Sequence, residues 1–249
     1  MRLFLTGDTH GKWDCDKIFN FNEAHKDKLT KEDVMFILGD FGAIFKQEDK
    51  ELLDKYEACN FTTFFLGGNH EDYYLLNQYP KEYIETYGCM TRAIRPGSIY
   101  MVMNGEVCSF FNYNFLVMGG ASSIDKAWRI EGIDWWPEEI PSDTEKLHCL
   151  ENCLQLSIDF ILTHTPCAID INKWSKAMHK YLWSQDEYAE WLNILKQTTL
   201  CLKWYSAHMH SDNALDLRTR IIYNDIIEFL PDGSEVVHKN YNERGDTLY

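Results

Sequence analysis

Gly7-Asp8-Thr9-His10-Gly11 directly follows a short apolar run at residues 2–6. Two more apolar runs, at residues 34–38 and 62–66, also end in glycine followed by polar residues. Asp8, Asp40 and Asn69 are spaced at intervals of roughly thirty residues, which is the length of a strand–helix–strand unit with its crossover helix. The N-terminal region therefore predicts an α/β fold whose parallel strands are buried on both faces.

The rest of the chain contains further apolar runs that are typical of strands. They lie at residues 99–103, 107–111, 115–118, 157–163, 200–207, 216–225 and 226–239. Asn104-Gly105 predicts a two-residue hairpin between the first two runs. Pro231-Asp232-Gly233 predicts a turn that splits the last run, so residues 216–239 are expected to form closing antiparallel strands.

Helical patterns occur in three places. Phe45, Leu52, Leu53 and Tyr56 form one apolar face between the second and third predicted strands. Ser142-Asp143-Thr144-Glu145 predicts a capping box that opens a helix with Leu147, Leu150 and Leu154 on one face. Ser184-Gln185-Asp186-Glu187 predicts a second capping box. It precedes a core-facing helix that carries Tyr188, Trp191, Leu192 and Leu195.

Length and charge restrict the class of protein. The chain has 249 residues, 45% of them hydrophobic and 25% charged, which excludes a disordered or fibrous protein and fits a single domain over residues 1–249. The net charge of −15 disfavours general binding to nucleic acid or to an anionic membrane. Without an apolar run of about 18 residues or a signal peptide at Met1–Leu5, the sequence predicts a cytoplasmic protein.

The cysteines are scattered, and none forms a Cys-x-x-Cys pair. They are Cys15, Cys59, Cys89, Cys108, Cys149, Cys153, Cys167 and Cys201. This spacing favours reduced core thiols over a disulfide framework. Cys149 and Cys153 are spaced to share a helix face, but two thiols alone do not make a zinc site.

Residue types that bind metals follow five of the predicted strands. The five segments are Gly7-Asp8-Thr9-His10-Gly11, Gly39-Asp40, Gly68-Asn69-His70-Glu71, Thr163-His164 and Ala207-His208-Met209-His210. The carboxyl ends of parallel strands open onto one crevice, so these side chains are expected to meet there. Each motif alone has a plainer explanation, such as a capping aspartate, a turn or a surface histidine. Their occurrence at five strand ends favours a site.

The combination of carboxylates, one carboxamide and several imidazoles indicates which ions would bind. It suits Mn, Fe, Zn, Ni or Co, whereas calcium prefers oxygen ligands alone. There are more candidate ligands than one ion needs. One carboxylate can bridge two ions about 3.5–4 Å apart, and such a pair serves in phosphoester hydrolysis.

These five segments resemble the signature blocks of the calcineurin-like metallophosphoesterase superfamily. The resemblance implies a four-layer αββα sandwich with two mixed sheets and a dinuclear metal site at the carboxyl ends of the strands. It implies that one ion is bound by Asp8, His10, Asp40 and His210. The other ion would be bound by Asp40, Asn69, His164 and His208, with Asp40 as the bridge. His70 would lie beside the ions and donate a proton or a hydrogen bond.

The implied activity is hydrolysis of a phosphomonoester or phosphodiester by a metal-bridging hydroxide, with His70 as proton donor. Asp40 and His70 would be catalytic, and Asn69 and His70 would also contact the phosphate. Small-molecule or nucleotide substrates are favoured, and two divalent ions are expected, with manganese preferred. Phosphoprotein phosphatases of this superfamily carry an Asp and an Arg-Gly soon after Asp40. The sequence here reads Phe41-Gly42-Ala43-Ile44, which argues against that alternative.

Two other features leave alternatives open. A scaffold that has lost catalysis is the third hypothesis, but the full ligand set argues against it. Ala207 replaces the glycine that is usual in the last block, a change that the site is expected to tolerate.

The tryptophan-rich loop at residues 119–141 is similar to a segment of small bacterial and phage phosphoesterases in this superfamily. Lys126 and Arg129 are candidates to bind the phosphate, or else are surface charges. Trp128, Trp135 and Trp136 could form a packed plug or could stack on a base.

Overall fold

The computed structural model describes residues 1–180, 186–239 and 241. Its larger sheet has the strand order β16-β15-β1-β2-β5-β8-β7-β6. The strands are β1 (Leu3–Thr6), β2 (Val34–Ile37), β5 (Thr62–Phe65), β6 (Lys81–Ile84), β7 (Cys89–Arg95), β8 (Ile99–Val102), β15 (Ile226–Phe229) and β16 (Glu235–His238). β1, β2, β5 and β8 run parallel to one another, and antiparallel strands flank them. The sheet is therefore mixed, and its parallel centre agrees with the prediction from spacing.

The second sheet is also mixed and has the order β13-β14-β12-β11-β10-β9. Its strands are β9 (Val107–Phe110), β10 (Tyr113–Met118), β11 (Phe160–Thr163), β12 (Lys203–Ser206), β13 (Asn213–Asp216) and β14 (Thr219–Ile221). β10, β11, β12 and β14 are parallel. A separate two-stranded ribbon is formed by β3 (Ile44–Phe45) and β4 (Gln47–Glu48).

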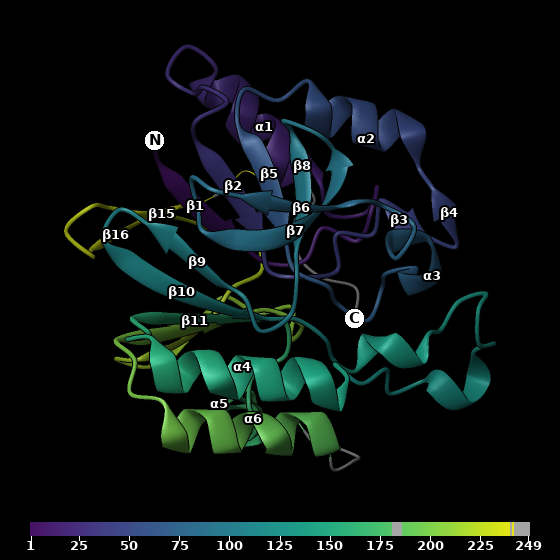
Figure 1. Ribbon diagram of the computed structural model, residues 1–249, viewed down its shortest axis with the longest axis vertical. Coiled ribbons are helices and arrows are strands. Elements are labelled where there is room, and N and C mark those ends of the chain that lie inside the picture. Colours follow the sequence, from purple (N-terminus) through teal and green to yellow (C-terminus); the bar gives the residue numbers. More distant parts are fainter. Residues whose placement is uncertain (181–185, 240, 242–249) are drawn as a thin grey trace.

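Helices cover the outer faces of both sheets, which gives four layers (Figure 1). α1 (Asp16–His25) and α2 (Lys50–Glu57) bury Ile18, Phe21 and Leu53 against the first sheet. α4 (Asp143–Gln155), α5 (Ala168–Met178) and α6 (Glu187–Thr198) lie on the side of the second sheet. The remaining short helices are α3 (Tyr73–Leu76) and two 3-10 turns, Lys126–Trp128 and Pro137–Glu139. None of the described helices is long and apolar enough to cross a membrane.

A continuous apolar core lies between the two sheets. It joins Leu5 and Phe36 of the first sheet to Phe115 and Phe160 of the second. Burial of apolar surface contributes roughly 25 cal/mol per Å² to stability. Because this core holds the two sheets together, it also fixes how their strand ends face each other. All eight cysteines are free thiols, and six of them are buried.

The predicted hairpin at Asn104-Gly105 is wrong. β8 pairs with β5 on one side and β7 on the other, so both of its edges are occupied within the first sheet. β9 pairs with β10 in the second sheet. The turn, in which Gly105 has φ +84°, therefore carries the chain from one sheet to the other.

The predicted apolar face of α4 is also wrong. Leu147 and Leu154 are 56% and 87% exposed, whereas Cys149 is buried in the core beneath the helix. Leu150 and Cys153 pack partly against that core. Cys149 and Cys153 are four residues apart, so the two thiols share the stripe that meets the sheet. The capping box at Ser142 and Glu145 is confirmed.

The remaining differences concern the ends of elements. α6 is capped by Asp186, whose side chain accepts bonds from the backbone N–H groups of Tyr188 and Ala189, and Ser184 lies outside the described residues. The run at 216–225 is not one strand, because β13 and β14 form a short hairpin and β14 runs parallel to β12. β15 and β16 form the predicted antiparallel hairpin. Phe45 lies in the β3–β4 ribbon rather than on a helix.

Candidate metal centre

The predicted ligands converge at the carboxyl ends of parallel strands from both sheets. Asp8, Asp40 and Asn69 follow β1, β2 and β5 of the first sheet. His164 follows β11, and His208 and His210 follow β12 of the second sheet. Asp8, Asp40, Asn69 and His164 are buried, while His10, His70, His208 and His210 are partly exposed. The site therefore has a buried base and a rim of imidazoles that reaches solvent.

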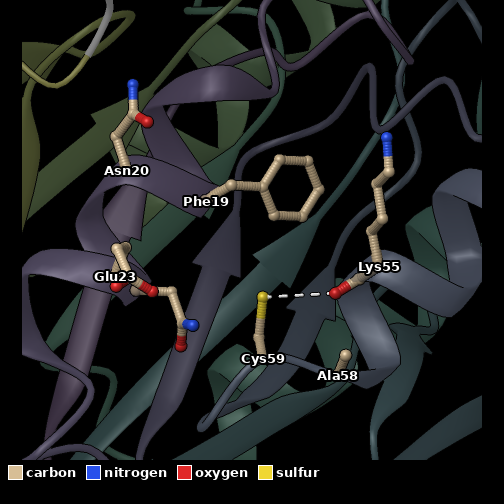
Figure 2. Close-up of a pocket in the computed structure, with 7 residues that line it drawn as sticks. Phe19, Asn20, Glu23, Lys55, Ala58 and Cys59 are labelled. Atoms are coloured by element: carbon tan, nitrogen blue, oxygen red, sulfur yellow. Dashed lines mark hydrogen bonds between the residues drawn. The ribbon is translucent and has the colours of Figure 1, made fainter.

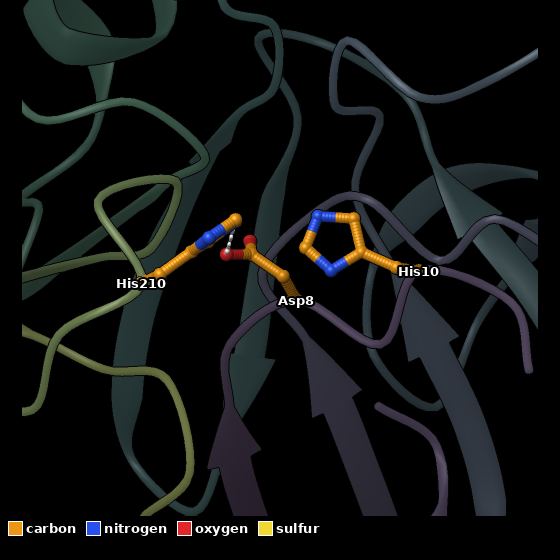
Figure 3. Close-up of side chains that lie close together, drawn as sticks. All are labelled: Asp8, His10 and His210. Carbon is orange, nitrogen blue, oxygen red and sulfur yellow. Dashed lines mark ion pairs between the residues drawn. The ribbon is translucent and has the colours of Figure 1, made fainter. Parts of the chain in front are cut away.

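The first group consists of Asp8, His10 and His210, whose ligand atoms all lie within 4.8 Å of one another. Asp8 lies between the two imidazoles (Figure 3). His210 Nε2 is 3.4 Å from Asp8 Oδ2, and the His10 and His210 rings are 4.7 Å apart. Tyr223 stacks on the His210 ring at 4.9 Å and limits its rotation.

The second group consists of Asp40, His164 and His208, and a third group, formed by His10, Asp40 and His70, shares one residue with each of the other two. His164 Nε2 lies 3.3 Å from Asp40 Oδ1 and 3.3 Å from Asn69 Oδ1. The other carboxylate oxygen, Asp40 Oδ2, lies 3.2 Å from His10 Nε2. The two oxygens of Asp40 thus face histidines of different groups, which is the arrangement that a bridging carboxylate needs.

The residues fit a pair of cations on three observations. Asp8 Oδ2 is buried and accepts no hydrogen bond from the described residues, although His210 Nε2 lies 3.4 Å away, so this oxygen is available to a cation that His210 would also bind. The donors are carboxylate and imidazole, a set that suits divalent transition metals. His10, Asp40, His208 and His210 all have φ between +43° and +63°. Such backbone costs on the order of 1–3 kcal/mol per residue and is concentrated at functional sites.

Hydrogen bonds to one ring nitrogen orient the imidazoles of His164 and His10 toward Asp40. His164 Nδ1 donates to the Leu38 carbonyl at 2.7 Å, which leaves Nε2 directed at Asp40 and Asn69. His10 Nδ1 lies 2.8 Å from Asp14 Oδ2, which leaves its Nε2 directed at Asp40. A partner on the far nitrogen fixes the tautomer and the ring orientation of a metal-binding histidine.

The electrostatics of the site depend strongly on Asp40. Burial opposes ionisation of this carboxyl, but His164, His70 and His10 outweigh burial and hold its pKa well below the usual value. Burial lowers the pKa of His164, but the Asp40 carboxylate outweighs it and raises that pKa to about 9. Burial and the neighbouring His164 lower the pKa of His208 to about 3. In the metal-free site, His164 therefore carries a proton at pH 7 and His208 does not.

Metal binding is accordingly expected to release protons and to strengthen as the pH rises. An ion bound at His164 Nε2 must displace the proton that this ring holds up to its pKa of about 9. Between pH 7 and pH 9, the apparent affinity for that ion should rise by up to about tenfold per pH unit for each displaced proton. Calorimetric titration of manganese in buffers of different ionisation enthalpy measures the release. Equal heats in all buffers at pH 7.5 would contradict the assignment of His164.

Two glycines allow the backbone to approach the candidate ligands very closely. A Cβ atom at Gly39, where φ is +91°, would lie 2.3 Å from His164 Nδ1, and one at Gly68 would lie 2.1 Å from Asp40 Oδ1. Both distances are far below any real contact. Only glycine lets these strand ends approach the ligands so closely.

Several supporting residues are not predicted from the sequence. Lys17 is fully buried in α1, and its ammonium donates to the carbonyl oxygens of Gly7, Asp8 and Tyr223. Burial lowers the pKa of Lys17 to about 8. Glu71 is buried and accepts the backbone N–H groups of Phe41 and Gly42, which holds the loop after Asp40. The i, i+4 spacing of His10 and Asp14 is a sequence signal that could have indicated their contact.

The loop at residues 119–141 places its predicted residues differently. Lys126 is exposed. Arg129 is mostly buried, with its Nε 2.8 Å from Asp125 Oδ1, and its charge acts on His70. Trp128 is 88% exposed, whereas Trp136 is buried and packs edge-on against Phe45 at 5.6 Å. The tryptophans therefore do not form one packed plug.

Ala207 is accommodated in the core between the sheets. Its side chain is fully buried there, and its backbone N–H donates to the His164 carbonyl at 2.8 Å. Phe41 occupies the position after Asp40 and stacks on Phe65 at 4.4 Å. The side chain at this position therefore packs in the core and offers no polar group to the site.

A separate pocket of about 470 Å³ lies between α1 and α2 (Figure 2). Its lining includes Glu23, Lys55 and Cys59, and it contains no histidine. Burial raises the pKa of the Cys59 thiol to about 12, so the thiol is not activated. This pocket lacks the groups that phosphoester chemistry needs.

The chain belongs to the calcineurin-like phosphoesterase family, whose model matches residues 1–212. This match confirms the resemblance of the strand-end motifs. The family is generally hydrolytic and uses divalent metals, and the described residues supply candidate histidine and aspartate ligands. No curated protein matches the chain significantly in sequence.

Two similar solved structures share the fold at low identity. TT1561 of Thermus thermophilus is 11% identical, with a TM-score of 0.52, and the match covers 96% of this chain and 98% of that one. A second crystal structure is 8% identical, with a TM-score of 0.53 and the same coverage. AQ665 from Aquifex aeolicus, described as a protein of unknown function, is 15% identical over 80% of this chain and 87% of its own, with a TM-score of 0.34.

Proposed function

We propose that this protein is a dinuclear metal-dependent phosphoesterase that acts on small-molecule or nucleotide phosphomonoesters or phosphodiesters. The observation that carries the proposal is the position of Asp40, whose two oxygens lie 3.2 Å and 3.3 Å from histidines of two separate ligand groups. Asp8, His10, Asp40 and His210 would hold one ion. Asp40, Asn69, His164 and His208 would hold the other, and manganese is the preferred metal for both.

Two bound divalent ions would supply activation of water and positive charge for the phosphoryl oxygens. The charge matters here because the whole chain carries −15 and would otherwise repel a phosphate. Asn69 suits this task, since a carboxamide can hold a cation without adding negative charge beside the substrate.

His70 would assist the leaving group. Its backbone N–H donates to Asp40 Oδ1 at 2.8 Å, and its ring lies 5.4 Å from the His10 ring and 5.3 Å from the Phe45 ring. Burial lowers the pKa of His70, partly opposed by the Asp40 carboxylate. The imidazole would hold a proton or an N–H at the leaving oxygen, as general acids do near neutral pH.

Arg129 is the better of the two proposed phosphate-binding cations. Asp125 and the Asp134 carbonyl orient its guanidinium, at 2.8 Å and 3.3 Å, and its charge acts on His70. A planar guanidinium can bind two phosphate oxygens at once. Lys126 is exposed on the same 3-10 turn and would contribute only a distant charge.

The proposal is tested with p-nitrophenyl phosphate and bis(p-nitrophenyl) phosphate. The protein is first treated with a chelator, and manganese is then added back in steps. Hydrolysis of at least one ester should be lost on chelation and recovered after two equivalents of manganese. Two bound ions with no hydrolysis of either ester would favour a non-catalytic scaffold. A later screen of nucleotides, cyclic nucleotides and phosphopeptides identifies the substrate class.

A further inference from the structure

The loop at residues 119–141 reaches the metal centre behind Asn69. Asn69 Nδ2 donates a hydrogen bond to Ser123 Oγ at 3.2 Å, while Asn69 Oδ1 lies 3.3 Å from His164 Nε2. Asn69, Ser123 and Glu139 are only 6%, 3% and 2% exposed. A carboxamide has one donating and one accepting end, so the contact with Ser123 decides which end faces the ligands.

Ser123 can accept this hydrogen bond because its own proton is used elsewhere. Ser123 Oγ donates to Glu139 Oε2 at 2.6 Å, and the Ser123 backbone N–H donates to Glu139 Oε1 at 2.8 Å. Burial raises the pKa of Glu139, and the hydrogen bonds from Ser123 oppose that rise. In its ionised form this carboxylate only accepts hydrogen bonds. The hydroxyl proton therefore points at Glu139, and the free lone pairs of the hydroxyl point at the Asn69 nitrogen.

The loop that carries this pair is anchored on both sides. The Gly120 N–H donates to the Gly67 carbonyl at 2.7 Å, next to the turn that carries Asn69. Trp136 is buried against Phe45 and begins the 3-10 turn that places Glu139. The position of Ser123 relative to Asn69 is therefore fixed by packing as well as by hydrogen bonds.

We propose that Ser123 and Glu139 are positioning residues that direct Asn69 Oδ1 toward the ion held by Asp40, His164 and His208. This inference rests on the proposed function, because it presupposes that Asn69 is a metal ligand. It gives this part of the loop a task within the reaction: Ser123 and Glu139 would set the orientation of one ligand of one ion without contacting substrate themselves.

Glu139→Gln tests the inference with almost no change of shape. The Ser123 N–H still needs an acceptor, so the carboxamide oxygen of the introduced glutamine should face this N–H. The carboxamide nitrogen then faces Ser123 Oγ and must donate a hydrogen bond to it. The hydroxyl proton is then free to donate to Asn69, which favours the flipped carboxamide with its NH₂ group toward the ion. Loss of such an outer contact typically costs about 10- to 100-fold in metal affinity. We expect this loss for one ion only.

Ser123→Ala is the second variant and removes the acceptor itself, with the same expected loss. Glu138→Gln is the matched control, because Glu138 is the exposed carboxylate next to Glu139 on the same turn. Manganese is titrated into each chelator-treated protein, and calorimetry gives the affinity for each ion. Circular dichroism melting of the metal-free proteins verifies that each variant folds.

The outcomes separate the two proposals. Weakening of one ion in both Glu139→Gln and Ser123→Ala, with Glu138→Gln like the wild type, supports the positioning role. Two ions bound with wild-type affinity in both variants would overturn it and leave the proposed function intact. A wild-type protein that binds no manganese would overturn the proposed function, and the positioning role with it.

Discussion

Asp40→Asn is expected to abolish both metal binding and hydrolysis. Each oxygen of Asp40 faces a histidine of a different group, and the substitution replaces one oxygen with an NH₂ group that repels a cation. Removing one partner of a buried charge pair costs about 3–5 kcal/mol, and a loss of that size in binding corresponds to roughly 10²- to 10⁴-fold in affinity. Asparagine tolerates the left-handed backbone at this position, where φ is +47°, so the fold should survive.

The matched control for Asp40→Asn is Asp54→Asn on α2, where the carboxylate is exposed. Manganese stoichiometry is measured by equilibrium dialysis, and turnover is measured with the p-nitrophenyl esters. The control should bind two ions and hydrolyse normally. An Asp40→Asn protein that keeps both ions and wild-type turnover would show that Asp40 is not the bridge.

His70→Ala is expected to leave both ions bound and to slow hydrolysis by about 10²- to 10⁴-fold, the usual contribution of a positioned general acid. The loss should depend on the leaving group. An alkyl phosphate, whose leaving oxygen is strongly basic, should suffer most, and p-nitrophenyl phosphate should suffer least because its leaving group needs little protonation.

Three measurements make the His70 result specific. The kcat for a series of leaving groups gives the dependence on basicity, and metal content is measured on the same samples. His179→Ala is the control, because His179 is an exposed residue at the C-terminal end of α5. A fall in metal stoichiometry in His70→Ala would make His70 a ligand, and an equal loss for all leaving groups would argue against proton donation.

The convergence of the candidate ligands could be predicted from the sequence because the information for it is local. Each ligand lies within a few residues of a strand end, and the parallel topology then brings the ends of neighbouring strands together. Asp40 is an example. The segment Gly39-Asp40 alone is typical of an ordinary turn, and only its regular spacing from Asp8 and Asn69 indicates that Asp40 belongs to a site.

The supports of the site could not be predicted in this way. Lys17 is a lysine in an ordinary helical segment, and only tertiary packing places its ammonium among three carbonyl oxygens. The contact of Asn69 with Ser123 joins residues that are far apart in the chain. Neither helical nor strand periodicity in the sequence predicts such a contact, because the contact depends on how a long loop folds back onto the sheet.

The errors in the fold have a similar origin. Asn104-Gly105 does form a turn, but whether a turn makes a hairpin depends on which strand edges are still free, and both edges of β8 are occupied. The α4 pattern offered two faces, one with leucines and one with thiols. The sheet buries Cys149 and leaves Leu147 and Leu154 exposed, so the hydrophobicity of the two faces alone does not predict which one is buried.

The ligands are divided between two sheets whose shared core combines aliphatic and aromatic side chains. Asp8, Asp40 and Asn69 belong to one sheet and His164, His208 and His210 to the other, while Phe115 and Phe229 pack across the interface at 5.2 Å. A pair of bound ions would cross-link the two halves of the sandwich at one rim. Each ion would take ligands from both halves, so shear between the halves would distort the coordination of both ions, and the packing between the sheets, far from the substrate, would influence the geometry of the site.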